Sequence, residues 1–318
     1  MHAIERQFIL GFTALAAVGV AAGTVVRKTR ERERKRLYAT HVRADGSPVE
    51  IEFFTPPQAK AAVFFENGLG MPHETWSWVC DNLPEDIAYV RYNRPGYGRS
   101  AAAENHTIAE GFTLVDELCD TYVPNLPLTM VGHSIGGYLV AAYAASRADT
   151  RPFEKLVLVD STNIDQLHNV RNAGYDQWTR QGLLMERFWA FSGLTAISRS
   201  EKRSEYSAAV EASRRGFSTS PGTWLTAYRE YRAALAFPPL GKVQVPVDVV
   251  TARTALSGTA HDDGQAELLK ISDISQHHFL DGADHMRILS DPSHAGQIAT
   301  LIAWADASHL PEVLEGAS

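Results

Sequence analysis

The order of short apolar runs and helical segments most constrains the fold of this chain. Six runs have the length and composition of buried strands, at residues 61–65, 87–92, 128–132, 155–159, 245–250 and 278–280. Helical periodicity occupies residues 74–83, 107–122, 135–146 and 292–307, between or after these runs. Strands that alternate with helices predict a doubly wound α/β domain with a mostly parallel sheet.

Two segments depart from this alternation. Residues 37–42 and 49–54 flank the turn sequence Asp-Gly-Ser-Pro at residues 45–48, which predicts a β-hairpin. Residues 161–240 are too long for an ordinary connection and include many aromatic residues: Trp178, Phe188, Trp189, Phe191, Tyr206, Phe217, Trp224, Tyr228 and Tyr231. We expect a helical cap over the edge of the sheet where such folds bind ligands. The alternative is a structural subdomain with an aromatic core.

The N-terminal segment contains an uncharged run at residues 8–26. As a helix it would be roughly 28 Å long, so we predict a single transmembrane helix. A cleaved signal peptide with its cleavage site near Val20, Ala21 and Ala22 is the alternative. Seven basic residues follow the run and oppose translocation, which predicts a cytoplasmic location for the rest of the chain: Arg27, Lys28, Arg30, Arg32, Arg34, Lys35 and Arg36. Gly19 and Gly23 would allow two such helices to pack closely, as in a homodimer.

Length and charge limit the number of domains and the class of binding partner. At 318 residues and 45% apolar composition, the chain supplies one large core or two small ones. We assign residues 1–36 to the anchor and a basic linker, and residues 37–318 to one domain with the cap at about 161–240. The first 36 residues hold eight basic and three acidic residues, which leaves 22 and 34 for the remainder. A net charge of −12 there argues against nucleic-acid binding.

The sequence also gives no indication of a metal or cofactor. Cys80 and Cys119 lack the C-x-x-C spacing and the histidine neighbours of a structural metal site. We therefore predict two ordinary buried or partly buried thiols, no metal site and no cofactor.

The pentapeptide Gly-His-Ser-Ile-Gly at residues 132–136 is the sharpest chemical signal. It follows an apolar run directly and precedes a helix directly, which is the context of a nucleophile on a strained turn. Gly132 and Gly136 leave room for that turn, and Gly137 would allow the helix to approach the strand. We expect Ser134 to be the nucleophile and the backbone amide of Ile135 to stabilise an oxyanion.

Together with three further motifs, this pentapeptide resembles the α/β-hydrolase family over most of residues 50–308. Residues 64–70, Phe-Phe-Glu-Asn-Gly-Leu-Gly, are similar to the family's loop after the third strand, and that resemblance implies Leu69 as the second oxyanion donor. Asn67 stands where the family usually has histidine. Residues 92–100 resemble the loop after strand four. Residues 280–286, Leu-Asp-Gly-Ala-Asp-His-Met, resemble the loop that supplies the general base, which implies that role for His285.

The acid that orients His285 is ambiguous. The family often places it after strand seven, yet residues 251–256 contain no carboxylate. Asp160, at the end of the run 155–159, is our preferred acid, because some relatives carry the acid there. Asp262 or Asp263 is the alternative, although an aspartate at a helix start commonly caps free N–H groups. We expect His73, His277, His278 and His294 to be surface or packing residues, and His133 to be the one other histidine that could line the pocket.

These observations predict an esterase- or lipase-like serine hydrolase that acts through an acyl-enzyme on Ser134. The aromatic cap and the anchor favour an apolar, lipid-like ester as substrate. The fold also serves thioesterases, C–C bond hydrolases and perhydrolases. Dehalogenase activity is disfavoured because its nucleophile would be an aspartate. A membrane-tethered, non-catalytic binding protein is the alternative from another class.

Overall fold

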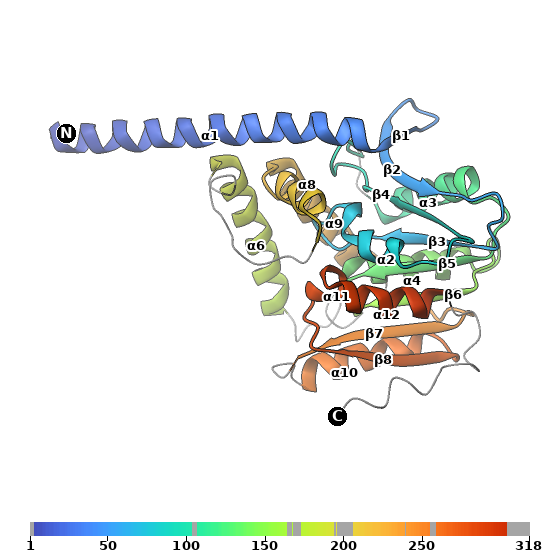
Figure 1. The fold of residues 1–318 in the computed structure, drawn as a ribbon. Coiled ribbons are helices and arrows are strands. Elements are labelled where there is room, and N and C mark those ends of the chain that lie inside the picture. The colour runs from blue at the N-terminus through green and yellow to red at the C-terminus, as the bar shows by residue number, and fades with distance from the viewer. Residues whose placement is uncertain are drawn as a thin grey trace.

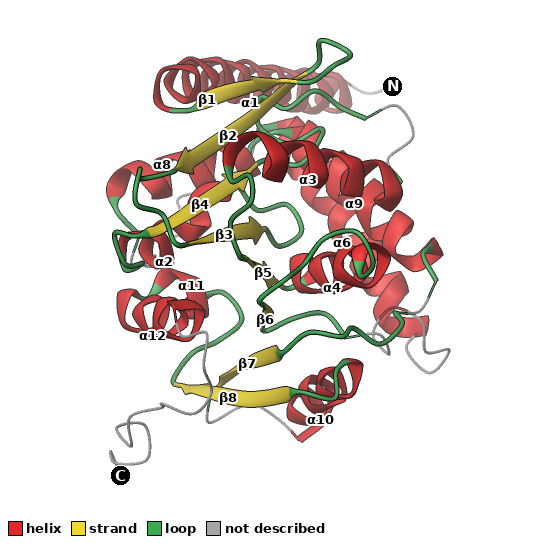
Figure 2. Cartoon of the chain, turned by 90° about the vertical axis from the view of Figure 1, so that its right-hand side faces the viewer, coloured by secondary structure: helices red, strands yellow, loops and turns green. Residues whose placement is uncertain are grey.

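The centre of the molecule is one eight-stranded sheet (Figure 2). The computed structural model describes residues 3–103, 107–163, 167, 173–193, 195, 206–238, 240–254 and 259–303. In spatial order the strands are β1 (Ala39–Val42), β2 (Pro48–Phe54), β4 (Ile87–Tyr92), β3 (Ala61–Glu66), β5 (Leu128–His133), β6 (Lys155–Val159), β7 (Val247–Arg253) and β8 (Ser275–Asp281). The pairs β1–β2 and β2–β4 are antiparallel, and every later pair is parallel. The predicted hairpin and the mostly parallel sheet are thus confirmed.

Helices cover both faces of the sheet (Figure 2). One hydrophobic cluster joins the sheet to α3 (Ile108–Tyr122), α4 (Ile135–Arg147) and α9 (Pro221–Ala236). A second joins the opposite face to α2 (Ser77–Asp81), α11 (Arg287–Ser290) and α12 (Pro292–Ala303). Neighbours along β3 divide between the clusters, with Phe64 in the first and Phe65 in the second. This division follows from the alternation of side chains along a strand. The last four residues of the helix predicted at 292–307 lie outside the described residues.

The segment 161–240 forms the helices α6 (Ala173–Ser192), α8 (Ala208–Ser218) and α9. Its aromatic residues do not share one environment. Those on α6 are exposed: Trp178, Phe188, Trp189 and Phe191. Tyr206, Phe217 and Tyr231 are buried, and Trp224 and Tyr228 pack against the core. The core interpretation therefore holds for α8 and α9, whereas α6 presents an aromatic surface.

Residues 8–26 belong to α1 (Ala3–Leu37), a single helix that runs past the rest of the molecule (Figure 1). In the described part of the chain, no helix is long and apolar enough to cross a membrane, so the predicted transmembrane span is not supported. The basic segment after it is also not a linker. It continues the same helix, and its Arg34 is buried against the domain.

Gly19 and Gly23 of α1 approach the end of α6. A methyl group on Gly19 would lie 2.4 Å from the backbone oxygen of Ser192, and one on Gly23 would lie 3.3 Å from the Cα of Gly193. The small residues that suggested helix pairing thus allow contact within one chain. A homodimer and a cytoplasmic location remain predictions of the sequence pattern.

The two cysteines are both free and buried, as predicted. Burial raises the pKa of each thiol to about 12, so neither is a reactive thiolate at neutral pH.

Candidate active site

Ser134 lies at the turn between β5 and α4. Its backbone has φ 55° and ψ −125°, a left-handed conformation that is strained for a residue other than glycine. Hydrogen bonds from the neighbouring strand and loop hold the turn. The Ser134 amide donates to the Val159 carbonyl at 3.1 Å, and the Thr162 amide donates to the Ser134 carbonyl at 2.9 Å. Ser134 is partly exposed, which the predicted role of nucleophile requires.

The glycines around Ser134 are required by close backbone contacts. A methyl group on Gly132 would lie 2.3 Å from the carbonyl oxygen of Gly136, and one on Gly137 would meet the hydroxyl of Ser161. A methyl on Gly136 would lie 2.4 Å from the carbonyl oxygen of Glu66. The last contact brings the turn against the loop after β3, because β3 and β5 are adjacent parallel strands. The two amides proposed as oxyanion donors, those of Leu69 and Ile135, therefore come from neighbouring segments.

Arg94 holds the loop after β3 through hydrogen bonds to its backbone. Its guanidinium donates to the backbone carbonyls of Asn67 at 2.7 Å and Gly68 at 3.3 Å. It also pairs with Glu66 at 2.9 Å and, through two nitrogens, with Glu230 of α9 at 2.7 and 3.0 Å. Such a planar, bidentate arrangement is specific to arginine. Arg94 lies in the segment 92–100, whose resemblance to the family's loop after strand four supported the fold more than the mechanism.

Asn67 stands where the family's histidine was expected. Its side-chain amide donates to the carbonyl of Tyr92 at 2.7 Å, so the residue joins the loop after β3 to the end of β4. Its backbone also lies against the turn at Ser134, because a methyl group on Gly136 would be 2.6 Å from the carbonyl oxygen of Asn67.

His285 follows β8 in the loop that sequence analysis selected. Its Nδ1 lies 2.6 Å from Oδ2 of Asp160, and the carboxylate of Asp160 is buried at the end of β6. This contact leaves Nε2 as the nitrogen available to a serine. The described residues show no hydrogen bond between the side chains of Ser134 and His285, a contact that often tightens only with substrate. Asp262, the competing acid, lies 3.5 Å from Arg253.

The carboxylate of Asp160 is surrounded by donors. The amide of Ala252 donates to Oδ1 at 3.0 Å, and Nε2 of His261 lies 3.0 Å from the same oxygen. Burial alone would raise the pKa of Asp160, but the hydrogen bonds from His261 and His285 outweigh it and lower that pKa well below its usual range. Sequence reasoning missed His261, because a contact across 101 residues has no local signal.

His133, the histidine that the sequence placed as a possible lining residue of the pocket, is not exposed to a pocket. It is fully buried, and its Nε2 donates to the backbone carbonyl of His285 at 2.9 Å. The two imidazole rings lie 4.6 Å apart between centroids. Burial and the neighbouring His285 lower the pKa of His133 to about 3. The residue is thus a neutral donor that positions the loop carrying His285.

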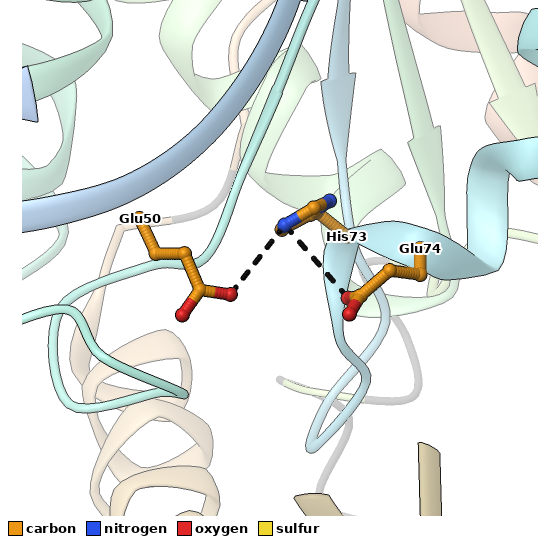
Figure 3. Close-up of side chains that lie close together, drawn as sticks. All are labelled: Glu50, His73 and Glu74. Carbon is orange, nitrogen blue, oxygen red and sulfur yellow. Dashed lines mark ion pairs between the residues drawn. The ribbon is translucent and has the colours of Figure 1, made fainter. Parts of the chain in front are cut away.

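A cluster away from Ser134 offers the donor types of a metal site (Figure 3). His73, expected at the surface or in packing, is fully buried with its Nε2 3.5 Å from Glu50 and 3.8 Å from Glu74. Both carboxylates already pair with the guanidinium of Arg34 from α1. Glu74 also accepts from the hydroxyl of Ser213, and Glu50 accepts from the side-chain amide of Asn93. Arg34 is therefore the cation that these carboxylates hold, and the cluster ties α1 to the domain.

A cavity of about 650 Å³ is lined by residues of α3, α4 and α9, among others. Its walls include Ile135, Phe112 and Met130, with Glu66, Arg94 and Glu230 among the polar residues. Of the described residues, neither Ser134 nor His285 lines it. The cavity thus reaches Ile135 but not the candidate nucleophile Ser134, and we do not assign it to the substrate.

Comparisons with known proteins bear on the family and the fold. The family model described as "Alpha/beta hydrolase family" matches residues 63–311. No match was found among curated proteins. Solved structures are similar at low identity. An esterase from Exiguobacterium antarcticum is 13% identical, with a TM-score of 0.63 over 84% of this chain and 98% of that one.

Two further structures have different stated activities. An enol-lactonase from Burkholderia xenovorans is 17% identical, with a TM-score of 0.59 over 83% of this chain and 98% of that one. A Cif epoxide hydrolase from Acinetobacter nosocomialis is 11% identical, with a TM-score of 0.66 over 88% and 96%. At such identities the structures support the fold and leave the reaction open. The family model covers most of the chain, and the chain belongs to the alpha/beta hydrolase family.

Proposed function

We propose that the protein is a serine hydrolase that cleaves a carboxylic ester through an acyl-enzyme on Ser134. The observation that carries the proposal is the strained turn at Ser134, with φ 55° between β5 and α4. A conformation of this cost persists where it exposes a reacting side chain. The hydrogen bond between His285 and Asp160 supports it, because it orients an imidazole as general base.

In the proposed reaction, the hydroxyl oxygen of Ser134 attacks the ester carbonyl carbon. The proton of this hydroxyl passes to Nε2 of His285. The amides of Leu69 and Ile135 donate to the oxyanion of the tetrahedral intermediate. His285 then gives the proton to the departing alcohol, and the acyl group stays on Ser134. A water molecule, deprotonated by His285, hydrolyses the acyl-enzyme and restores the hydroxyl.

The chemistry of the nucleophile also separates esters from epoxides, the substrates of the epoxide hydrolases among the similar structures. A serine that opened an epoxide would form an ether with the substrate, and water does not readily hydrolyse an ether. A serine acylated by an ester or lactone forms an ester, which the same base and oxyanion donors can hydrolyse. Thioesters, carbon–carbon bonds next to a carbonyl and perhydrolysis fit the same acyl-enzyme and are the alternatives to the proposed ester within acyl transfer.

The surroundings of the oxyanion loop favour an apolar acyl group. Trp224 of α9 lies against the loop, because a methyl group on Gly70 would be 3.1 Å from its ring. The indole nitrogen of Trp224 donates to the carbonyl of Ser218 at 2.7 Å, which fixes the ring beside Leu69 and Gly70. An aromatic wall next to the proposed donors suits an aliphatic or aromatic acyl chain.

A fluorophosphonate probe tests the proposal, because it labels activated serines covalently. We expect labelling of the full chain that disappears in Ser134→Ala and His285→Ala, with Ser146→Ala at the other end of α4 as the matched control. We also expect Asp160→Asn to lower kcat for a p-nitrophenyl ester by roughly 10² to 10⁴, and Asp262→Asn to retain wild-type turnover. Folded wild-type protein without labelling would reject the enzyme in favour of a non-catalytic binding protein.

A further inference from the structure

His261 is an ionisable residue of the site that the proposed reaction does not use. It belongs to α10 (Thr259–Glu267), the helix after β7. Its Nε2 lies 3.0 Å from Oδ1 of Asp160, while Nδ1 of His285 lies 2.6 Å from Oδ2. One buried carboxylate therefore bridges two imidazole rings, one on each oxygen.

The position of His261 is built into the fold. Gln265, one turn later on the same face of α10, donates to the carbonyl of Ser161 at 2.7 Å. A methyl group on Gly264 would lie 2.5 Å from the side-chain nitrogen of Asn163, so α10 packs closely on the segment after β6. The carboxylate is held from the other side by the amide of Ala252 at 3.0 Å. These contacts hold α10 and the carboxylate of Asp160 next to each other.

We propose that His261 is a positioning residue for the candidate base, because it competes with His285 for the single negative charge of Asp160. The carboxylate can neutralise one imidazolium, so a proton on His261 disfavours a second proton on His285. The form of His285 that can accept a proton from Ser134 is then favoured. This inference rests on the proposed function only in assigning His285 as the base.

The charges around His261 agree with this assignment. Its hydrogen bond to Asp160 raises the pKa of His261, and partial burial opposes that rise. On its own helix it faces Asp262, whose carboxylate lies 3.5 Å from Arg253 at the end of β7. From the loop after β8 the facing group is His285, through Asp160. The imidazolium form of His261 is therefore favoured in the mildly acidic range where a general base becomes protonated.

The expected size of the effect follows from Coulomb's law. For two cations about 6 Å apart, effective dielectric constants between about 80 and 20 correspond to roughly 0.5 to 2 pH units. Removal of the charge on His261 should raise the pKa of His285 by that amount. The acidic limb of the profile of kcat/KM against pH should move upward with it, because this limb reports the free enzyme's base.

The test compares His261→Gln and His261→Ala with the wild type in profiles of kcat/KM for a p-nitrophenyl ester. Gln keeps a donor for Asp160 without a charge, whereas Ala removes both. His278→Gln is the matched control, because His278 pairs with Asp248 at 2.9 Å, four residues before Ala252 along β7. We expect both His261 variants to move the acidic limb upward by at least 0.5 pH unit, and the control to leave it in place.

A limb that is unmoved in both variants would overturn the proposal, even if their rates fell, because a purely structural residue changes rate without changing the titration. A parallel titration of the His285 imidazole by NMR, with the resonance assigned by His285→Gln, does not require turnover. If the wild type proves inactive, the proposed function fails. A raised pKa of His285 in His261→Gln would still support the inference, and an unchanged one would refute it.

Discussion

Two buried residues beside His285 have different charge states, each set by its surroundings. Asp160 is buried yet ionised, because hydrogen bonds from two imidazole rings and from the Ala252 amide stabilise its negative charge. His133 is neutral because burial, the largest cause, and the neighbouring imidazole of His285 lower its pKa by more than the hydrogen bond to the His285 carbonyl raises it. A charged group thus lies beside His285 on one side, and an uncharged one lies on the other.

The neutral state of His133 predicts a loss of stability at mildly acidic pH. In the unfolded chain its pKa is near 6.5, whereas in the fold it is about 3. As the pH falls below 6.5, the unfolded chain takes up a proton that the native state refuses. His133 alone should therefore lower the free energy of unfolding by about 2 kcal/mol between pH 7 and pH 5. Urea denaturation at both values should show a smaller decline in His133→Gln, and equal declines would contradict the assignment.

Between elements, the loop after β3 depends on a contact that spans the cap and the sheet. Arg94 joins two backbone carbonyls of that loop to Glu230 of α9, and the hydroxyl of Tyr97 donates to the same carboxylate at 2.6 Å. The amide of Gly70 in turn donates to Tyr97 at 3.2 Å. The proposed oxyanion loop is therefore positioned by α9 as well as by its own strand.

Arg94→Lys should separate this positioning role from charge alone. Lysine keeps the positive charge but cannot reach both carboxylates and both carbonyls at once. We expect kcat for a p-nitrophenyl ester to fall roughly tenfold, less than the 10² to 10³ that removal of a donor costs, with KM little changed. Arg99→Lys is the control, because Arg99 lies in the same segment 92–100 as Arg94 but donates to the exposed Thr40 at 2.9 Å. Wild-type kcat with only a lower Tm would show that the contact is structural.

On the scale of the whole molecule, α1 is joined to the domain by the cluster of Arg34, Glu50, His73 and Glu74. Burial by itself would raise the pKa of Glu74, but His73 and Arg34 lower it to about 2. The cluster includes residues of α1, β2, the turn η1 (His73–Trp76) and, through Ser213, the cap helix α8. It therefore connects segments that are far apart in the sequence.

Removal of Arg34 should be costly, because Glu50 and Glu74 are fully buried and would lose their shared cation. We expect Arg34→Ala to lower the free energy of unfolding by about 3 to 5 kcal/mol in urea denaturation. Arg36→Ala, an exposed position on the same helix, is the matched control and should change it by less than about 0.5 kcal/mol. Similar midpoints for the two variants would show that α1 does not depend on this cluster.

The sequence by itself determined the strand and helix order, the turn at Ser134 and the loop of His285, because these are local patterns of apolar residues, glycines and turn residues. Tertiary structure alone decided which carboxylate reaches His285, that His261 shares it, and that Arg94 holds the loop after β3. Those contacts join the end of β6 to the segments after β7 and β8, or the segment after β4 to α9. The order of the strands in the sheet brings these segments together, and the sequence of neither partner carries a pattern that reveals the contact. The N-terminal segment gives a further example. Its composition indicated an apolar span, whereas the burial of Arg34 against Glu50 and Glu74, 16 and 40 residues away, showed a helix attached to the domain.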